Sequence, residues 1–158
     1  MRRAWLPGGV VAVLCACSSP PPKEPSAAAP ATASREKPVD ESRRFPMAGQ
    51  VSMKLVEDHL LGKDFLPGGN VAEYRQRGKT YRQFLVRAKS PEAAALLMFD
   101  FKSRLREAKY LPHMGGYFGA DGDQPVYVFQ KGAFFAGLVG LPEKEADPLA
   151  RQFAARLG

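Results

Sequence analysis

The stretch "NVAEYRQRGKTYRQFLVRA" (residues 70–88) decides the fold. Two runs rich in aromatic and branched residues lie on either side of Arg77-Gly78-Lys79, and a short break that contains glycine is typical of a β-hairpin turn. In the second run, apolar residues recur at every second position from Phe84 to Ala88, which is the period of a strand. The stretch therefore predicts two antiparallel strands, because a tight turn brings the chain back alongside itself.

A helix is predicted directly after this hairpin, beginning at Ser90-Pro91-Glu92. Serine can cap the free amides of the first turn, and proline is tolerated at the first helical position. Glu92 suits the positive end of the helix dipole. Apolar residues then recur at helical spacing, so the helix is expected to end near Lys109. The apolar face contains Ala94, Leu97, Phe101, Leu105 and Ala108.

The second half of the chain predicts a second hairpin and a second helix. "PVYVFQ" and "AFFAGLVGL" flank Lys131-Gly132, and "GGYFGAD" adds a strand before the Asp121-Gly122-Asp123 turn. The second helix begins at Pro142 or Glu143 and runs to the C-terminus. Its apolar stripe contains Leu149, Phe153, Ala154 and Leu157. The opening stretch "VSMKLVEDHLLG" (residues 51–62) is compatible with a strand at its start and with a helix at its end.

These elements predict an α+β fold in a single domain over residues 46–158. The expected order is two strands, a helix, about three strands and a helix. Hairpins imply antiparallel pairing, so we expect an antiparallel sheet with the two helices packed on one face. The segment contains no cysteine, and its length suffices for a core without disulfides.

Residues 17–45 read as a disordered Pro/Ala-rich linker. The sequence "SSPPPKEPSAAAPATASREKPVDESRRF" (residues 18–45) is nearly free of residues that could form a core, so burial cannot offset the entropy of ordering it. The functional interpretation is a spacer that holds the domain away from a membrane. The alternative is a tail with no role beyond solubility.

Residues 1–16 are predicted to be a lipoprotein signal peptide. A basic start at Arg2-Arg3 precedes a short apolar run, which is far below the about 20 residues that a membrane span requires. Leu14-Cys15-Ala16-Cys17 resembles a bacterial lipobox, and this resemblance implies lipidation of Cys17 as the first residue of the mature chain. The alternatives are a metal site or a redox pair, but a zinc site requires four ligands from separated positions.

The lipobox implies a place for the protein. We expect it in the bacterial cell envelope, anchored to a membrane by its N-terminal lipid and facing the periplasm. Ser18 follows the lipidated cysteine, and a residue other than aspartate there resembles outer-membrane lipoproteins of enteric bacteria, so the outer membrane is preferred over the inner one.

Several segments of the folded part resemble one bacterial family. The sequences "DFLPGGNVAEYRQRGKTY", "SPEAAALLMFDFK", "GGYFG" and "KGAFFAGLVGL" look like the domain of unknown function 6599 over roughly residues 60–157. These motifs are turn glycines, a helix start and strand cores. The resemblance implies an envelope-associated single domain, and it implies no catalytic residue, because the family name carries no activity.

The sequence predicts no catalytic residue. A nucleophile requires a positioned base beside it, and Ser90 and Ser103 are better explained as a helix cap and a helix residue. His59 and His113, the two histidines of the chain, are interpreted as exposed or hydrogen-bonded side chains.

The sequence also predicts no metal site and no cofactor. Asp121-Gly122-Asp123 lacks the further oxygen ligands that a calcium loop needs, so we interpret it as a turn. Gly115, Gly116 and Gly119 lack the Gly-Lys-Ser/Thr and the helix that follow in a Walker loop. Close backbone packing or a bulge accounts for these glycines.

The first hairpin carries the one candidate binding surface that the sequence offers. Its cations are Arg75, Arg77, Lys79 and Arg82, and they lie near Tyr74 and Tyr81. Such a surface could bind an anionic lipid or a polysaccharide, whereas nucleic acid is not expected outside the cytoplasm. The chain has a net charge of +7, but residues 46–158 hold 16 Lys and Arg against 12 Asp and Glu, which is only mildly basic. A solvated hairpin without a ligand is the simpler interpretation.

We therefore expect a non-enzymatic binding or accessory domain tethered to a membrane, with an envelope protein or an anionic lipid or polysaccharide as its partner. The rival hypothesis is a small periplasmic hydrolase whose acidic and histidine residues meet only in the fold. An enzyme should show a concave pocket that holds His113 or His59 beside a carboxylate. A binding domain should show a shallow face, for example at the basic hairpin.

Overall fold

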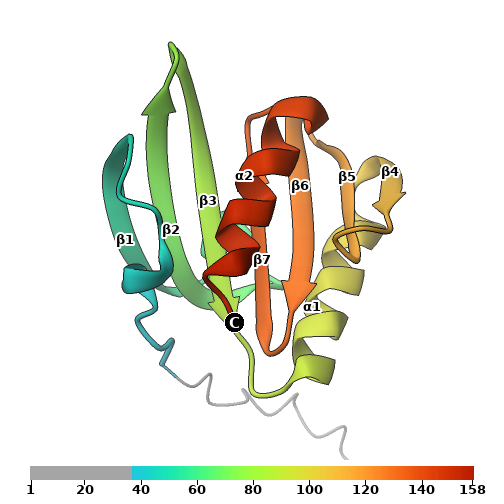
Figure 1. Cartoon of the computed structure of the whole chain (residues 1–158). Coiled ribbons are helices and arrows are strands. Elements are labelled where there is room, and N and C mark those ends of the chain that lie inside the picture. Colours follow the sequence, from blue (N-terminus) through green and yellow to red (C-terminus); the bar gives the residue numbers. More distant parts are fainter. Residues whose placement is uncertain (1–36) are drawn as a thin grey trace, which may run out of the picture. The chain divides into compact units, whose positions relative to one another are not determined.

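The hairpin predicted over residues 70–88 lies within an antiparallel sheet of seven strands, in a computed structural model that describes residues 37–158 (Figure 1). The strand order across the sheet is β1-β2-β3-β7-β6-β5-β4. The strands are β1 (Gln50–Asp58), β2 (Pro67–Gln76), β3 (Lys79–Arg87), β4 (Arg106–Leu111), β5 (Gly116–Asp121), β6 (Gln124–Lys131) and β7 (Phe134–Val139). The helices are α1 (Pro91–Ser103) and α2 (Glu143–Ala155), with short 3-10 helices η1 (Ser42–Arg44) and η2 (Leu60–Gly62). The predicted α+β single domain with an antiparallel sheet is confirmed.

Both predicted hairpins are present. In the first, Gln76 pairs with Lys79, so that only Arg77 and Gly78 form the turn between β2 and β3. In the second, Lys131 pairs with Phe134 at the end of β6 and the start of β7. The ambiguous stretch at residues 51–62 contains an element of each kind, because β1 is followed by η2.

The start of α1 agrees with the prediction and its end does not. The Ser90 hydroxyl oxygen accepts a hydrogen bond from the Ala93 amide at 3.2 Å. The predicted end near Lys109 is wrong, because the helix stops at Ser103 and β4 begins at Arg106. Pairing with β5 satisfies the backbone groups of these residues in a ladder, which replaces the hydrogen bonds of a longer helix.

The two helices pack on opposite faces of the sheet, which corrects the prediction that both cover one face (Figure 1). We call these faces the α1 face and the α2 face. Successive strand residues point to opposite faces, and the central strands are apolar at both sets of positions. Each face therefore requires its own cover. The α2 face buries Tyr81, Leu85, Tyr127, Phe129, Ala136 and Leu138, and the α1 face buries Phe84, Val86, Val126, Val128, Phe135 and Val139.

The folded part begins before Pro46, so the predicted boundary lies too late in the chain. Glu41 and Phe45 are each 1% exposed. The Phe45 ring lies 4.9 Å from the ring of Phe153 on α2, measured between centroids. The Glu41 carboxylate accepts hydrogen bonds from Arg44 at 2.7 Å and from Arg87 at 2.6 Å. Composition assigns Glu41 to the linker, but its carboxylate can be buried because two guanidinium groups pair with it.

Candidate functional site

The turn between β2 and β3 has an unusual residue at its first position. Arg77 has a φ of 51° and Gly78 a φ of 75°, so both residues are left-handed. Two left-handed residues define a type I′ turn, in which asparagine, aspartate or glycine is the usual first residue. Arginine has no such preference, so the turn holds Arg77 at a small conformational cost of about 1 kcal/mol.

The four cations of the hairpin do not form one surface. Arg75 and Arg82 point to the α1 face, where Arg82 donates a hydrogen bond to the Gln124 side chain at 3.0 Å. Lys79 shares the α2 face with its strand neighbour Tyr81, and Arg77 lies at the tip. The structure therefore divides the cluster that the sequence suggests into two pairs.

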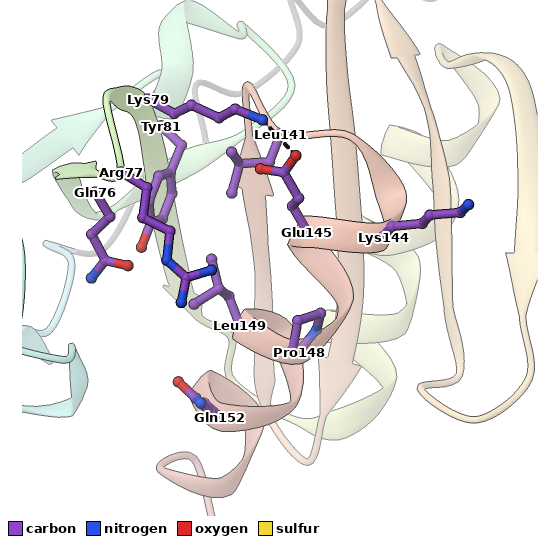
Figure 2. Close-up of a pocket in the computed structure, with 10 residues that line it drawn as sticks. All are labelled: Gln76, Arg77, Lys79, Tyr81, Leu141, Lys144, Glu145, Pro148, Leu149 and Gln152. Carbon is purple, nitrogen blue, oxygen red and sulfur yellow. Dashed lines mark hydrogen bonds and ion pairs between the residues drawn. The ribbon is translucent and has the colours of Figure 1, made fainter.

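A groove of about 650 Å³ lies between the first hairpin and α2 (Figure 2). We define the groove by the residues that line it. The hairpin contributes one side, and α2 with the segment before it contributes the other. The lining residues are Gln76, Arg77, Lys79, Tyr81, Leu141, Lys144, Glu145, Pro148, Leu149 and Gln152. Its volume lies within the range of small-molecule sites, which is roughly 300 to 1,000 Å³.

The charged groups of the groove are unequally available to a ligand. Lys79 Nζ lies 2.5 Å from Glu145 Oε1 across the groove, so these two charges neutralise each other. Lys144 points away from the hairpin, whereas Arg77 extends from the tip towards α2 (Figure 2). Within residues 37–158 the Arg77 guanidinium makes no hydrogen bond or ion pair. Arg77 is thus the available charge of the groove.

Tyr81 contributes a hydroxyl to the groove from a buried side chain. The residue is 3% exposed, and its ring stacks on that of Tyr74 at 5.1 Å between centroids. Burial raises the pKa of Tyr81 above its ordinary value, so the hydroxyl stays protonated and can donate. Tyr74 donates its own hydroxyl hydrogen bond to the Pro46 carbonyl at 2.8 Å, but the Tyr81 hydroxyl has no partner in the described part of the chain.

A second cluster of polar side chains joins α2 to the loop after β4. His113 Nε2 lies 2.5 Å from Asp147 Oδ1, and the Tyr127 hydroxyl donates to the same oxygen at 2.8 Å. Arg151 donates to the other oxygen of this carboxylate. Burial alone would raise the pKa of Asp147, but the donors on His113, Tyr127 and Arg151 outweigh it and lower that pKa to about 2.

This cluster does not form a nucleophilic site. His113 is about half exposed and lies outside the groove. Its partner is the Asp147 carboxylate, and no serine or cysteine hydrogen-bonds it among residues 37–158. A histidine with a carboxylate orients a base, but acyl transfer also needs a nucleophile within reach of that base. The contacts instead support a structural role, in which Asp147 holds α2 to β6 and to the loop after β4.

The remaining candidate residues have structural positions. His59 lies 3.3 Å from the neighbouring Asp58 carboxylate, measured from Nδ1, at the start of η2. Asp121 pairs with Lys63 at 2.7 Å. A Cβ atom on Gly116 would lie 2.2 Å from the Val128 carbonyl oxygen, so this glycine permits close packing of strands. In residues 37–158 no three His, Cys, Asp or Glu side chains gather as metal ligands would.

Sequence reasoning found one side of the groove and missed the other. The cations and tyrosines of the hairpin were visible as a pattern. The α2 side had no signal of a site, because Leu149 was assigned to the apolar stripe of the helix and Gln152 has no motif around it. The contact of His113 with Asp147 also joins residues far apart in the chain, so no local sequence pattern could predict it.

The predicted signal peptide, Cys17 and most of the linker lie outside the described residues. Among the residues that are described, neither helix is long and apolar enough to cross a membrane. No family model matches the chain, and no curated protein matches it.

Proposed function

We propose that this chain is a lipid-anchored protein of the bacterial cell envelope whose periplasm-facing domain binds a ligand without converting it. The groove between the first hairpin and α2 carries this proposal. It combines an available cation, an unpaired hydroxyl and an apolar floor, which are means of binding. None of its ten lining residues is a serine, threonine, cysteine or histidine.

The sequence supports the anchor. Leu14-Cys15-Ala16-Cys17 follows a basic and apolar leader, and the chain from Ser18 to about Val39 is rich in proline, alanine and serine. One acyl chain holds a protein only marginally, whereas the several chains of a lipoprotein anchor it stably. A spacer of this composition would leave the groove accessible at a distance from the membrane. The outer membrane remains our preferred location.

A periplasmic hydrolase is the competing function, and one observation favours it. His113 lies beside the Asp147 carboxylate, as a histidine base and its orienting group would. The pair and the groove are separate, however, so the base has no pocket in which to meet a substrate. We therefore prefer binding over turnover.

The anchor is tested by the mass of the mature protein. We expect the protein in the membrane fraction of a diderm bacterial host to begin at Cys17 and to carry diacylglycerol and acyl groups, as measured by intact-mass spectrometry. Cys17→Ser should abolish this modification, because the thiol is the acceptor. Cys15→Ser is the matched control and should leave it intact. An unlipidated mature chain that begins at another residue would contradict the proposal.

Binding and turnover are distinguished with the same purified protein. We expect p-nitrophenyl acetate and p-nitrophenyl phosphate to hydrolyse at the rate of the buffer, with and without His113→Gln. Turnover above that background, lost in His113→Gln, would establish the hydrolase instead.

A further inference from the structure

The geometry of the groove points to the chemistry of its ligand. We infer that the groove binds a small ligand with one oxyanion head, a carboxylate or a phosphate, on a compact apolar body. This inference rests on the proposed binding function and specifies its ligand class. Neither the hairpin nor α2 alone could provide the site, because the groove is lined by both.

Arg77 is the residue that would hold the head. Its guanidinium extends over the groove and makes no hydrogen bond or ion pair within the described residues (Figure 2). A guanidinium presents paired N–H donors that match the two oxygens of a carboxylate or phosphate. The left-handed backbone of Arg77, with a φ of 51°, places this side chain at the tip although other residues suit the turn better. Strain of this kind at a hairpin tip is a reason to look for function there.

Tyr81 would give the head a second donor. Its hydroxyl lines the groove, belongs to a side chain that is 3% exposed, and has no partner among residues 37–158. Because Tyr81 lines the groove, its hydroxyl is placed to donate to an acceptor on a ligand there. The raised pKa of Tyr81 keeps its proton available for donation. The side-chain amide of Gln152 on α2 is also unpaired in the described chain and lies on the opposite wall.

The body of the ligand would contact the apolar part of the lining. Leu141, Pro148 and Leu149 form this part, on the side of α2 and the segment before it. The volume of about 650 Å³ accommodates a ring or a short chain beside the head. Burying that body would contribute most of the affinity, and the head would fix its orientation.

The distribution of charge favours one head over a polyanion or an anionic surface. A polymer or a membrane would need several free cations on one side of the hairpin. Arg75 and Arg82 lie on the α1 face instead, and Lys79 is paired with Glu145. Lys144 points away from the hairpin (Figure 2). A single available guanidinium remains, which matches a single head.

The test is an NMR titration of the full-length lipidated protein in a non-ionic detergent. Phenyl phosphate and benzoate are the probes, and the amide resonances of Arg77, Gly78 and Gln152 are followed. Both probes should shift these resonances with a Kd below about 1 mM. Benzyl alcohol, which lacks the head, and inorganic phosphate, which lacks the body, should each bind at least about tenfold more weakly. The stronger of the two probes identifies the head.

Matched variants localise the interaction. Arg77→Gln should weaken probe binding about tenfold, because it removes a charge-assisted contact. Arg75→Gln makes the same change of charge on the same hairpin, but on the α1 face, and should leave the Kd unchanged. Tyr81→Phe should weaken binding about three- to tenfold while leaving the melting temperature unchanged, because its hydroxyl has no partner in residues 37–158.

Three results would overturn the inference. Equal weakening by Arg75→Gln and Arg77→Gln would indicate diffuse attraction of anions by the hairpin. Tight binding of vesicles rich in anionic lipid, with no shift from either probe, would establish a membrane surface as the partner. No shift at any concentration up to about 10 mM would exclude this ligand class. Lipidation of Cys17 and turnover are measured in separate experiments. A failure of this inference is therefore distinguishable from a failure of the proposed function.

Discussion

At the scale of single residues, Asp147 links α2 to its surroundings through three side chains. Its two carboxylate oxygens receive donors from His113, Tyr127 and Arg151. Only one of these donors, Arg151, lies on the same helix, so the carboxylate links α2 both to β6 and to the loop after β4. Hydrogen bonds to a charged group stabilise a fold more than those between neutral groups.

The ionisation of Asp147 predicts a loss of stability in acid. Its pKa in the folded chain is about 2, against an ordinary value of 3.8. Because the folded-state pKa is the lower one, this contribution is complete above about pH 4 and is lost as the pH falls towards 2. We expect Asp147→Asn to lower the free energy of unfolding by about 1 to 2 kcal/mol at pH 7. The loss is modest because His113 and Arg151 are exposed, so water screens their interaction with the carboxylate.

Urea denaturation at several pH values measures this contribution. The difference in free energy of unfolding between the wild type and Asp147→Asn should shrink as the pH falls from about 4 to 2. Other carboxylates with lowered pKa values, such as Glu41 and Glu92, contribute equally to both proteins and cancel in the difference. A difference that stays constant over this range would show that ionisation of Asp147 is not the cause.

At the scale of elements, α1 carries two aromatic residues with opposite environments. Phe101 is 2% exposed and contacts the rings of Phe84 and Phe135, with centroids 6.0 and 5.7 Å away. Phe99, two residues earlier on the same helix, is 61% exposed. This contrast follows from the helical period, which turns residues two positions apart to different sides.

The contrast predicts unequal effects of the same substitution. Phe101→Ala should lower the free energy of unfolding by about 3 to 5 kcal/mol, because it leaves a cavity between α1 and the sheet. Phe99→Ala is the matched control and should change it by no more than about 0.5 kcal/mol. Thermal and denaturant melts of both variants measure the difference. Similar losses for the two would mean that α1 does not pack as described.

The elements also show what local sequence can and cannot predict. Turns such as Arg77-Gly78 and caps such as Ser90 depend on nearest neighbours, so they were predicted correctly. The end of α1 depends on the pairing of Arg106–Leu111 with β5, which is a tertiary contact that local sequence does not reveal. Leu105 keeps its predicted burial after the helix has ended, whereas Ala108 lies exposed on the edge strand. Helical spacing therefore continued through residues that form no helix.

The predicted placement of both helices on one face was wrong for a related reason. The apolar residues of β3, β6 and β7 were recognised as strand cores, but runs such as Phe84–Val86 supply both faces of a sheet. Reading them as half-buried led to one covered face. The candidate site followed the same pattern. The hairpin with Arg77 and Tyr81 was visible in the sequence, whereas its place opposite α2 depends on tertiary packing.

At the scale of the whole described molecule, the segment before β1 is part of the fold. Phe45 packs on Phe153, and Glu41 is held by Arg44, Arg87 and the Asn70 side chain, which accepts the Glu41 amide hydrogen bond at 2.9 Å. These contacts cover an end of the α2 face that would otherwise expose the aromatic core. A domain cut at Pro46 would lose them all.

Two truncated chains test this attachment. A chain of residues 37–158 should melt in one cooperative transition that is unchanged by chelator or reductant, because it holds no cysteine and no metal cluster among its described residues. A chain of residues 46–158 should be less stable by about 2 to 5 kcal/mol, since it loses a buried aromatic ring and a buried ion pair. Equal melting temperatures would place the boundary at Pro46 after all.

The strand order has a consequence for how the chain folds. Of the six strand pairings in the described residues, five join strands that are consecutive in the chain, and only β3 with β7 joins distant ones. Consecutive strands can zip from short turns within microseconds, whereas Arg87 must find Phe134 across an intervening helix and three strands. We therefore expect the pairing of β3 with β7, which joins two meanders into one sheet, to be the slow step of folding.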